Sequence, residues 1–228
     1  MKQEIVNNPD FAALRVVFDA PGEQVIAESG AMLARDTAIE MKTSLQSGIG
    51  AAMKRKLLGG ESLFQNTFTA TAPGQSLWLA PAAEGSIQCI ELQPGMELFL
   101  QSGAYLASTP GVELDTKWQG AKGFFAKGLF LLKAKGAGLL WFSSYGAMHA
   151  VDIGASYAGY IVDNTHMVAF TQGLSYDVQK VGGLKSLFFS GEGLVCNFRG
   201  QGRLWMQTRN PSSLVSFLHP FRRVQSKS

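Results

Sequence analysis

The stretch LRVVFDAPGEQVIAESGAMLA, residues 14–34, returns as IQCIELQPGMELFLQSGAYLA at residues 87–107. The two stretches align without a gap at an offset of 73, and seven of their 21 positions are identical, including a Pro-Gly pair and a Ser-Gly-Ala triplet. A fainter third copy, residues 149–169, follows at an offset of 62. Self-similarity at fixed spacing indicates that the chain is built from repeated structural units.

The second half of the unit also recurs, and it is marked by the pairs Leu77-Trp78, Leu140-Trp141 and Leu204-Trp205. The tryptophans lie 63 and 64 residues apart, so the first copy carries extra residues between its halves. We therefore predict subdomains at 1–85 (with an insert at about 44–60), 86–147 and 148–210, followed by a C-terminal helix and basic tail at 211–228. The three aligned tryptophans are expected in the core, whereas Trp118 lies in a polar stretch and is expected at the surface.

Short β-rich runs fill each unit and are separated by Pro-Gly turns, because Pro presets φ and Gly accepts positive φ. This spacing of turns is typical of all-β sandwiches and barrels. We predict an all-β fold of three similar β-sandwich subdomains in a pseudo-threefold arrangement. One unit alone would bury a marginal core, and packing three together would cover apolar faces and strand edges.

The C-terminal segment breaks the strand pattern. Asn210 can cap a helix whose first residue is Pro211, where the missing N–H is not needed. Leu214, Phe217 and Leu218 would then share one helix face. The sequence predicts a short helix that stops at Pro220.

Composition bounds the setting of the protein. Of the 228 residues, 46% are apolar and only 16% charged, and the net charge of +3 is too small to indicate nucleic acid by itself. Cys89 and Cys196 lie at non-equivalent positions without metal-ligand spacing and are interpreted as reduced structural thiols. The N-terminal segment resembles no secretory signal, and no apolar run is long enough to span a bilayer. We therefore expect a cytoplasmic protein that associates with membranes, if at all, only peripherally.

Catalytic signals are weak. His149, His166 and His219 are the only histidines, and none has the spacing of a metal site. His166 replaces an alanine of the other copies, which leaves either a ligand contact or an ordinary surface or capped histidine. The Gly-x-Gly pairs do not fit a phosphate-binding loop and are interpreted as hairpin turns. The sequence predicts no catalytic, metal-binding or cofactor-binding residue, and hence no enzyme.

Basic residues recur between the two halves of every unit. Together they form a candidate contact surface for anions: Lys54, Arg55, Lys56, Lys117, Lys122, Lys127, Lys180 and Lys185. In a pseudo-threefold arrangement these segments would meet at one end and sum to one positive surface. The stretch GFFAKGLFLLKAKG, residues 123–136, would add exposed Phe and Leu, a mixture that suits anionic lipid headgroups. The alternative is that these lysines protect strand edges against pairing.

Two motifs carry a family resemblance: GGESLFQNTF at 59–68 and LWMQTR at 204–209. With them the chain, over residues 1–210, resembles the AIM-twenty-four (altered inheritance of mitochondria) family and its many bacterial members. The resemblance implies three subdomains like the protomer of the tryptophan RNA-binding attenuation protein, arranged as a pseudo-trimer. It implies no catalytic residues.

These observations favour a non-enzymatic scaffold or adaptor that works at or near anionic membranes. The alternative is an RNA- or small-ligand-binding module, which rests on analogy of fold. We expect self-association into trimers or higher rings, and the identity of a protein partner stays open.

Overall fold

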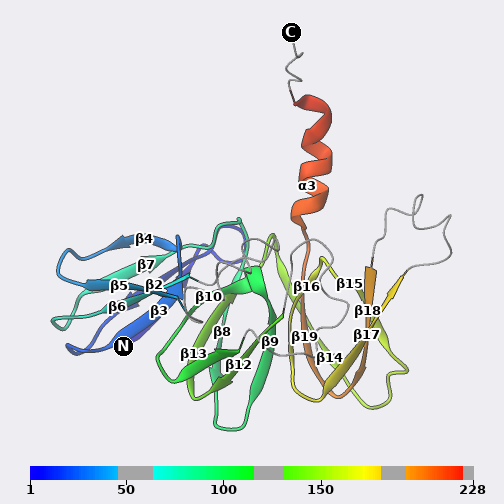
Figure 1. Cartoon of the computed structure of the whole chain (residues 1–228), viewed down its shortest axis with the longest axis horizontal. Coiled ribbons are helices and arrows are strands. Elements are labelled where there is room, and N and C mark those ends of the chain that lie inside the picture. Colours follow the sequence, from blue (N-terminus) through cyan, green and yellow to red (C-terminus); the bar gives the residue numbers. More distant parts are fainter. Residues whose placement is uncertain (46–63, 116–130, 181–193, 223–228) are drawn as a thin grey trace.

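The structure, a computed structural model, describes residues 1–45, 64–115, 131–180 and 194–222. The described part is almost entirely β-strand with one short C-terminal helix, which confirms the all-β prediction (Figure 1). After β1 (Lys2–Val6), the first repeat contains β2 (Ala13–Val17), β3 (Gln24–Glu28), β4 (Met32–Arg35), β5 (Glu40–Leu45), β6 (Phe64–Thr69) and β7 (Ser76–Leu79).

The other two repeats contain the same succession of six strands. The second consists of β8 (Ile87–Leu92), β9 (Glu97–Gln101), β10 (Tyr105–Ser108), β11 (Val112–Asp115), β12 (Leu131–Gly136) and β13 (Gly138–Ser143). The third consists of β14 (Met148–Ile153), β15 (Tyr160–Asp163), β16 (Met167–Thr171), β17 (Leu174–Lys180), β18 (Leu194–Gly200) and β19 (Gly202–Gln207). Helix α3 (Pro211–Leu218) follows and leads into a 3₁₀ turn at His219–Phe221.

Each repeat splits its strands between two sheets. In the first repeat, β2, β7 and β4 form one half-sheet, and β5, β6 and β3 form the other. The second half-sheet of one repeat joins the first half-sheet of the next through the antiparallel pairs β3–β10 and β9–β16. The result is four sheets in succession, β1-β2-β7-β4, β5-β6-β3-β10-β13-β8, β11-β12-β9-β16-β19-β14 and β15-β18-β17.

The repeats therefore lie in a row, from the first at the left of Figure 1 to the third at the right. Closure around a threefold axis would need a third junction, between β4 and β15. Among the described strands that junction is absent, because β4 pairs only with β7 and β15 only with β18. The prediction of three similar sandwich units is confirmed, but strand pairing joins them as an open array.

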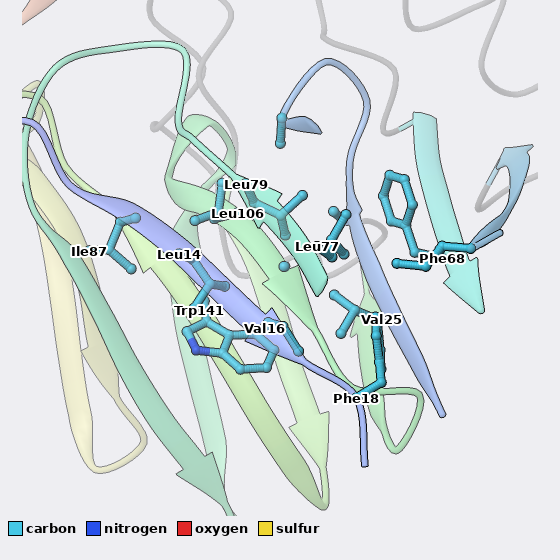
Figure 2. Close-up of a cluster of buried hydrophobic side chains, with 14 of the residues drawn as sticks. Leu14, Val16, Phe18, Val25, Phe68, Leu77, Leu79, Ile87, Leu106 and Trp141 are labelled. Carbon is cyan, nitrogen blue, oxygen red and sulfur yellow. The ribbon is translucent and has the colours of Figure 1, made fainter. Parts of the chain in front are cut away.

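Three apolar cores lie between successive sheets, and neighbouring repeats share them. The first core combines Leu14, Val16 and Leu77 of the first repeat with Trp141 of the second, and Figure 2 shows Trp141 beside Leu14 and Val16 of β2. The second core likewise takes in Trp205 of the third repeat. Packing an aromatic of this size into a neighbour's core joins adjacent repeats into one structure.

The aligned tryptophans consequently have different environments. Trp141 and Trp205 are buried, as predicted. Trp78 is only half-buried, and the guanidinium of Arg15 lies 5.5 Å from the centre of its ring. The reason is topological: β7, which carries Trp78, belongs to a sheet that no preceding repeat extends.

The predicted Pro-Gly turns are present. Gly22 and Gly95 have φ values of 86° and 87°, a conformation that L-residues with a Cβ rarely adopt. These turns join β2 to β3 and β8 to β9 at one end of the sheets, opposite the end from which α3 leaves.

Candidate interaction surface

Strand pairing places the ends of three long connections at one end of the sheets. Residues 46–63 join β5 to β6, residues 116–130 join β11 to β12, and residues 181–193 join β17 to β18. Because the junctions β3–β10 and β9–β16 repeat one geometry, these three connections begin and finish at the same end, which we call the connector end. Helix α3 leaves from this end as well, since it follows β19.

Most of the predicted basic contact residues belong to these connections. The following lie outside the described residues: Lys54, Arg55, Lys56, Lys117, Lys122, Lys127 and Lys185. Lys180 is the last residue of β17 and pairs with Leu194. Trp118 also lies outside the described residues. The positive surface therefore stays a prediction. The strands that flank the three connections end at the connector end.

The predicted apolar contribution of residues 123–136 is partly wrong. Leu131 and Leu132 lie in β12 and are buried. Lys133 and Lys135, on the same strand, form ion pairs with Glu97 at 3.0 Å and Glu113 at 3.2 Å. Strand pairing turns the leucines into core residues and leaves the two lysines already neutralised by carboxylates of neighbouring strands.

Exposed apolar side chains are instead concentrated on α3 and the turn after it. None of the helix residues is buried, and Figure 1 shows the helix projecting away from the sheets. The exposed large side chains of this segment are Leu214, Val215, Phe217, Leu218 and Phe221. The prediction of the helix and of its shared apolar face is confirmed, and that face is open to solvent. None of the described helices is long and apolar enough to cross a bilayer.

The root of α3 is fixed by a polar network. Asn210 accepts a hydrogen bond from the Ser213 backbone N–H through Oδ1 at 2.8 Å, as a helix cap does. The Asn210 Nδ2 lies 2.9 Å from Nε2 of His166, whose Nδ1 lies 2.7 Å from the Gln207 carbonyl oxygen. If Asn210 donates to Nε2, the imidazole carries its proton on Nδ1 and donates it to Gln207.

This network explains why the third repeat departs from the Ser-Gly-Ala pattern of the others. His166 occupies the position of Ala31 and Ala104 because it ties the β15–β16 turn to the chain that enters α3. The sequence left open a ligand contact or an ordinary surface or capped histidine. Both ring nitrogens of His166 have protein partners, as expected for a capped histidine, and the residue also lines the cleft beside α3.

A cleft of about 710 Å³ separates α3 from the adjacent loops. Its apolar wall includes Phe11, Leu214 and Phe217, and its polar rim includes Glu84 and Arg209. Arg209 is exposed and makes no ion pair with any described carboxylate. The connector end thus combines a projecting apolar helix with an accessible guanidinium at its base.

The two cysteines are not bonded to each other; Cys196 is buried and Cys89 is half-buried. Burial raises the pKa of the Cys196 thiol to about 12 and raises that of Cys89 as well. Among the residues that the structure describes, no group of three or more His, Cys, Asp or Glu side chains could hold a metal ion.

Comparison with known proteins identifies the family. The family model described as mitochondrial biogenesis AIM24 matches residues 3–209. The chain therefore belongs to this family, as its two sequence motifs predicted.

Two relatives come from Streptococcus pyogenes. The uncharacterised protein M6_Spy0233 of serotype M6 is 29% identical over 198 residues, which are 83% of this chain and 78% of the relative. The crystal structure of protein SPYM3_0169 is similar with a TM-score of 0.77 at 25% identity, over 97% of this chain and 99% of that one. The similarity over almost all of both chains supports the same architecture from end to end.

Sequence reasoning missed part of this surface. Phe11 belongs to no motif, and Arg209 closes the LWMQTR motif without any sign of what it would contact. The two residues come to line the same cleft only through the fold. The apolar face of α3 was visible in the sequence. Because a periodic apolar face ordinarily packs on a core, the sequence did not predict that this face would be exposed to solvent.

Proposed function

We propose that this protein is a non-enzymatic scaffold that associates with anionic lipid surfaces through its connector end. The observation that carries the proposal is helix α3, which projects from that end with its large apolar side chains in solvent. An exposed apolar helix needs a partner, because every buried Å² of apolar surface contributes about 25 cal/mol.

Lipid suits this surface better than a purely apolar partner does. The arginines at the two ends of the segment, Arg209 and Arg222, are exposed, and cations beside inserted aromatic residues favour anionic headgroups. The connection that carries Lys54, Arg55 and Lys56 starts and finishes at the same end of the sheets as α3. Each basic residue held near an anionic membrane surface contributes about 1 kcal/mol.

The proposal is tested by co-sedimentation of the full chain with vesicles. We expect the protein to pellet with vesicles that contain phosphatidylserine and to stay in solution with pure phosphatidylcholine. The double variant Phe217→Ser and Phe221→Ser should lose most of the pelleting. Tyr157→Ser is the matched control, because Tyr157 is an exposed aromatic in the turn between β14 and β15, at the opposite end of the sheets.

A second arm tests the basic connections. Replacing Lys54, Arg55 and Lys56 with Ala should weaken pelleting, and added salt should weaken it in the parent chain. Equal pelleting with both vesicle types, or with neither, contradicts the proposal. A salt-dependent shift with single-stranded RNA in place of vesicle binding would favour the alternative function.

A further inference from the structure

The sheet stack stops at each end with an incomplete sheet. The two internal sheets have six strands in the same order, three from one repeat and three from the next. The sheet at the start holds only the front half of this pattern, β2-β7-β4 with β1 added, and the sheet at the end holds only the back half, β15-β18-β17. Together these two halves have the composition of a third six-stranded sheet.

Both internal junctions use one register. In the first, Ala107 of β10 pairs with Ala27 of β3. In the second, Ala169 of β16 pairs with Leu100 of β9. The offsets of 73 and 62 that relate the repeats convert each pairing into the other, so the junction is a repeated property of the unit. Applied to the free edges, the same offsets place Ala34 of β4 opposite Val162 of β15.

The residues that cross each internal junction fill the core of the preceding repeat. Leu106, Ala107 and Trp141 belong to the core of the first repeat. Val168, Ala169 and Trp205 belong to the core of the second repeat. The equivalent residues of the first repeat are Leu33, Ala34 and Trp78, and none of them belongs to a buried core cluster.

The exposed fractions of equivalent residues also show that β4 and β15 lack a covering repeat. Leu106 and Val168 are both 0% exposed, whereas Leu33 is 62% exposed. On the other edge, Phe99 of β9 is 7% exposed and its equivalent Ile161 of β15 is 62% exposed. Residues of this kind in the middle of a strand edge invite pairing with another chain.

We propose that β4 of one copy of this protein pairs antiparallel with β15 of a second copy, with Ala34 opposite Val162 and Arg35 opposite Ile161. The pairing completes a sheet of order β17-β18-β15-β4-β7-β2 and places Leu33 and Trp78 on the core of the partner's third repeat. Each copy has one edge of each kind, so the contact is head-to-tail and builds a ring, or a filament where the rotation does not close. Every connector end then lies on one face of the assembly.

A second copy fits these edges better than an unrelated strand does. The free edges of β4 and β15 have the register and the alternation of apolar residues that the strands of the two internal junctions have. The core of the third repeat lacks the residues that a following repeat would supply. The competing self-contacts are β4 with β4 and β15 with β15, which would join identical edges and stop at a dimer.

Two edge variants separate these arrangements. Leu33→Lys places a charge on β4 and leaves β15 intact, and Ile161→Lys does the reverse. Each should be monomeric by size-exclusion chromatography with light scattering, while the parent chain forms multimers of its 24.5 kDa mass. Mixing the two variants should give a dimer of one copy of each and nothing larger. Met41→Lys is the control, because Met41 is exposed on the terminal strand β5, which corresponds to neither edge of a junction.

The outcomes decide the proposal. A parent chain that stays monomeric at its highest soluble concentration overturns it. If Ile161→Lys alone still forms dimers, or the mixture stays monomeric, the contact is not head-to-tail and the proposal is wrong. Circular dichroism of each variant verifies the fold.

A register test does not depend on the lysine variants. Opposite residues of antiparallel strands have Cα atoms about 4.5–5.5 Å apart, within reach of a disulfide. The double variant Ala34→Cys and Val162→Cys should form disulfide-linked multimers on mild oxidation, seen on non-reducing gels. Ala34→Cys with Ile161→Cys should not, because a shift of one residue puts the two side chains on opposite faces. Equal cross-linking of both pairs, or of neither, contradicts the register.

Discussion

At the scale of single residues, Tyr105 shows how one side chain can stabilise the contact between two repeats. It lies on β10 of the second repeat, is fully buried, and donates a hydrogen bond from its hydroxyl to the Ile26 carbonyl oxygen of the first repeat at 2.9 Å. The Tyr105 hydroxyl oxygen also accepts a hydrogen bond from Nε2 of Gln65 at 3.2 Å and lies 3.1 Å from Oγ of Ser108. Burial raises the pKa of this phenol, so the hydroxyl remains a donor at neutral pH. The sequence alignment places Met32 and Met167 at the equivalent positions, so the repeat pattern alone did not predict this contact.

Replacing Tyr105 with Phe should lower the free energy of unfolding by about 1–3 kcal/mol, because the change leaves buried polar partners without their hydrogen bond. Urea denaturation followed by circular dichroism measures the effect. The control is Tyr157→Phe, whose side chain is exposed and which should change stability by less than about 0.5 kcal/mol. A loss at Tyr105 no larger than that of the control would show that the hydroxyl contributes nothing at the junction.

At the scale of elements, α3 depends on its root because none of its residues is buried in the part of the chain that the structure describes. A helix of eight residues is marginal in water, and the described contacts that hold it are the Asn210 cap and the hydrogen bond from Asn210 to His166. The cap and the start of the helix were predictable, because Asn followed by Pro is a local signal. The role of His166 was not, because it joins residues 44 positions apart.

Asn210→Ala should leave global stability nearly unchanged and fray the helix. Loss of such a cap is worth about 1 kcal/mol, which corresponds to roughly fivefold faster amide hydrogen exchange across Ser213 to Phe217. Asn210→Ser keeps a capping oxygen and should exchange close to the parent rate. Unchanged exchange in the alanine variant would mean that contacts other than the cap hold α3.

At the scale of the whole molecule, the cores couple the repeats. The second core combines Leu92, Leu98 and Leu132 of the second repeat with Val168 and Trp205 of the third. A change in one repeat should therefore loosen its neighbour. This distinguishes the protein from a string of independent domains, whose cores would each be self-contained.

Trp205→Ala removes a large side chain from a shared core and should lower the free energy of unfolding by about 3–5 kcal/mol. Hydrogen exchange measured by mass spectrometry should accelerate in β8, β9 and β12 of the second repeat more than in β15 and β17 of the third. Acceleration confined to the third repeat would show that Trp205 stabilises only its own unit.

By itself the sequence determined the repeat, the strand-rich fold, the Pro-Gly turns and the capped C-terminal helix, because each depends on spacing or on local backbone preference. It could not decide which copies of an equivalent residue become buried. Leu33 and Leu106 look alike in the sequence, and so do Trp78 and Trp141, yet one of each pair is covered by a neighbouring repeat and the other is not. Burial is set by what packs against a strand, and in the open row of repeats no described strand pairs with the outer edge of β4 or of β15. That asymmetry, together with an apolar helix left in solvent, follows only from the tertiary structure.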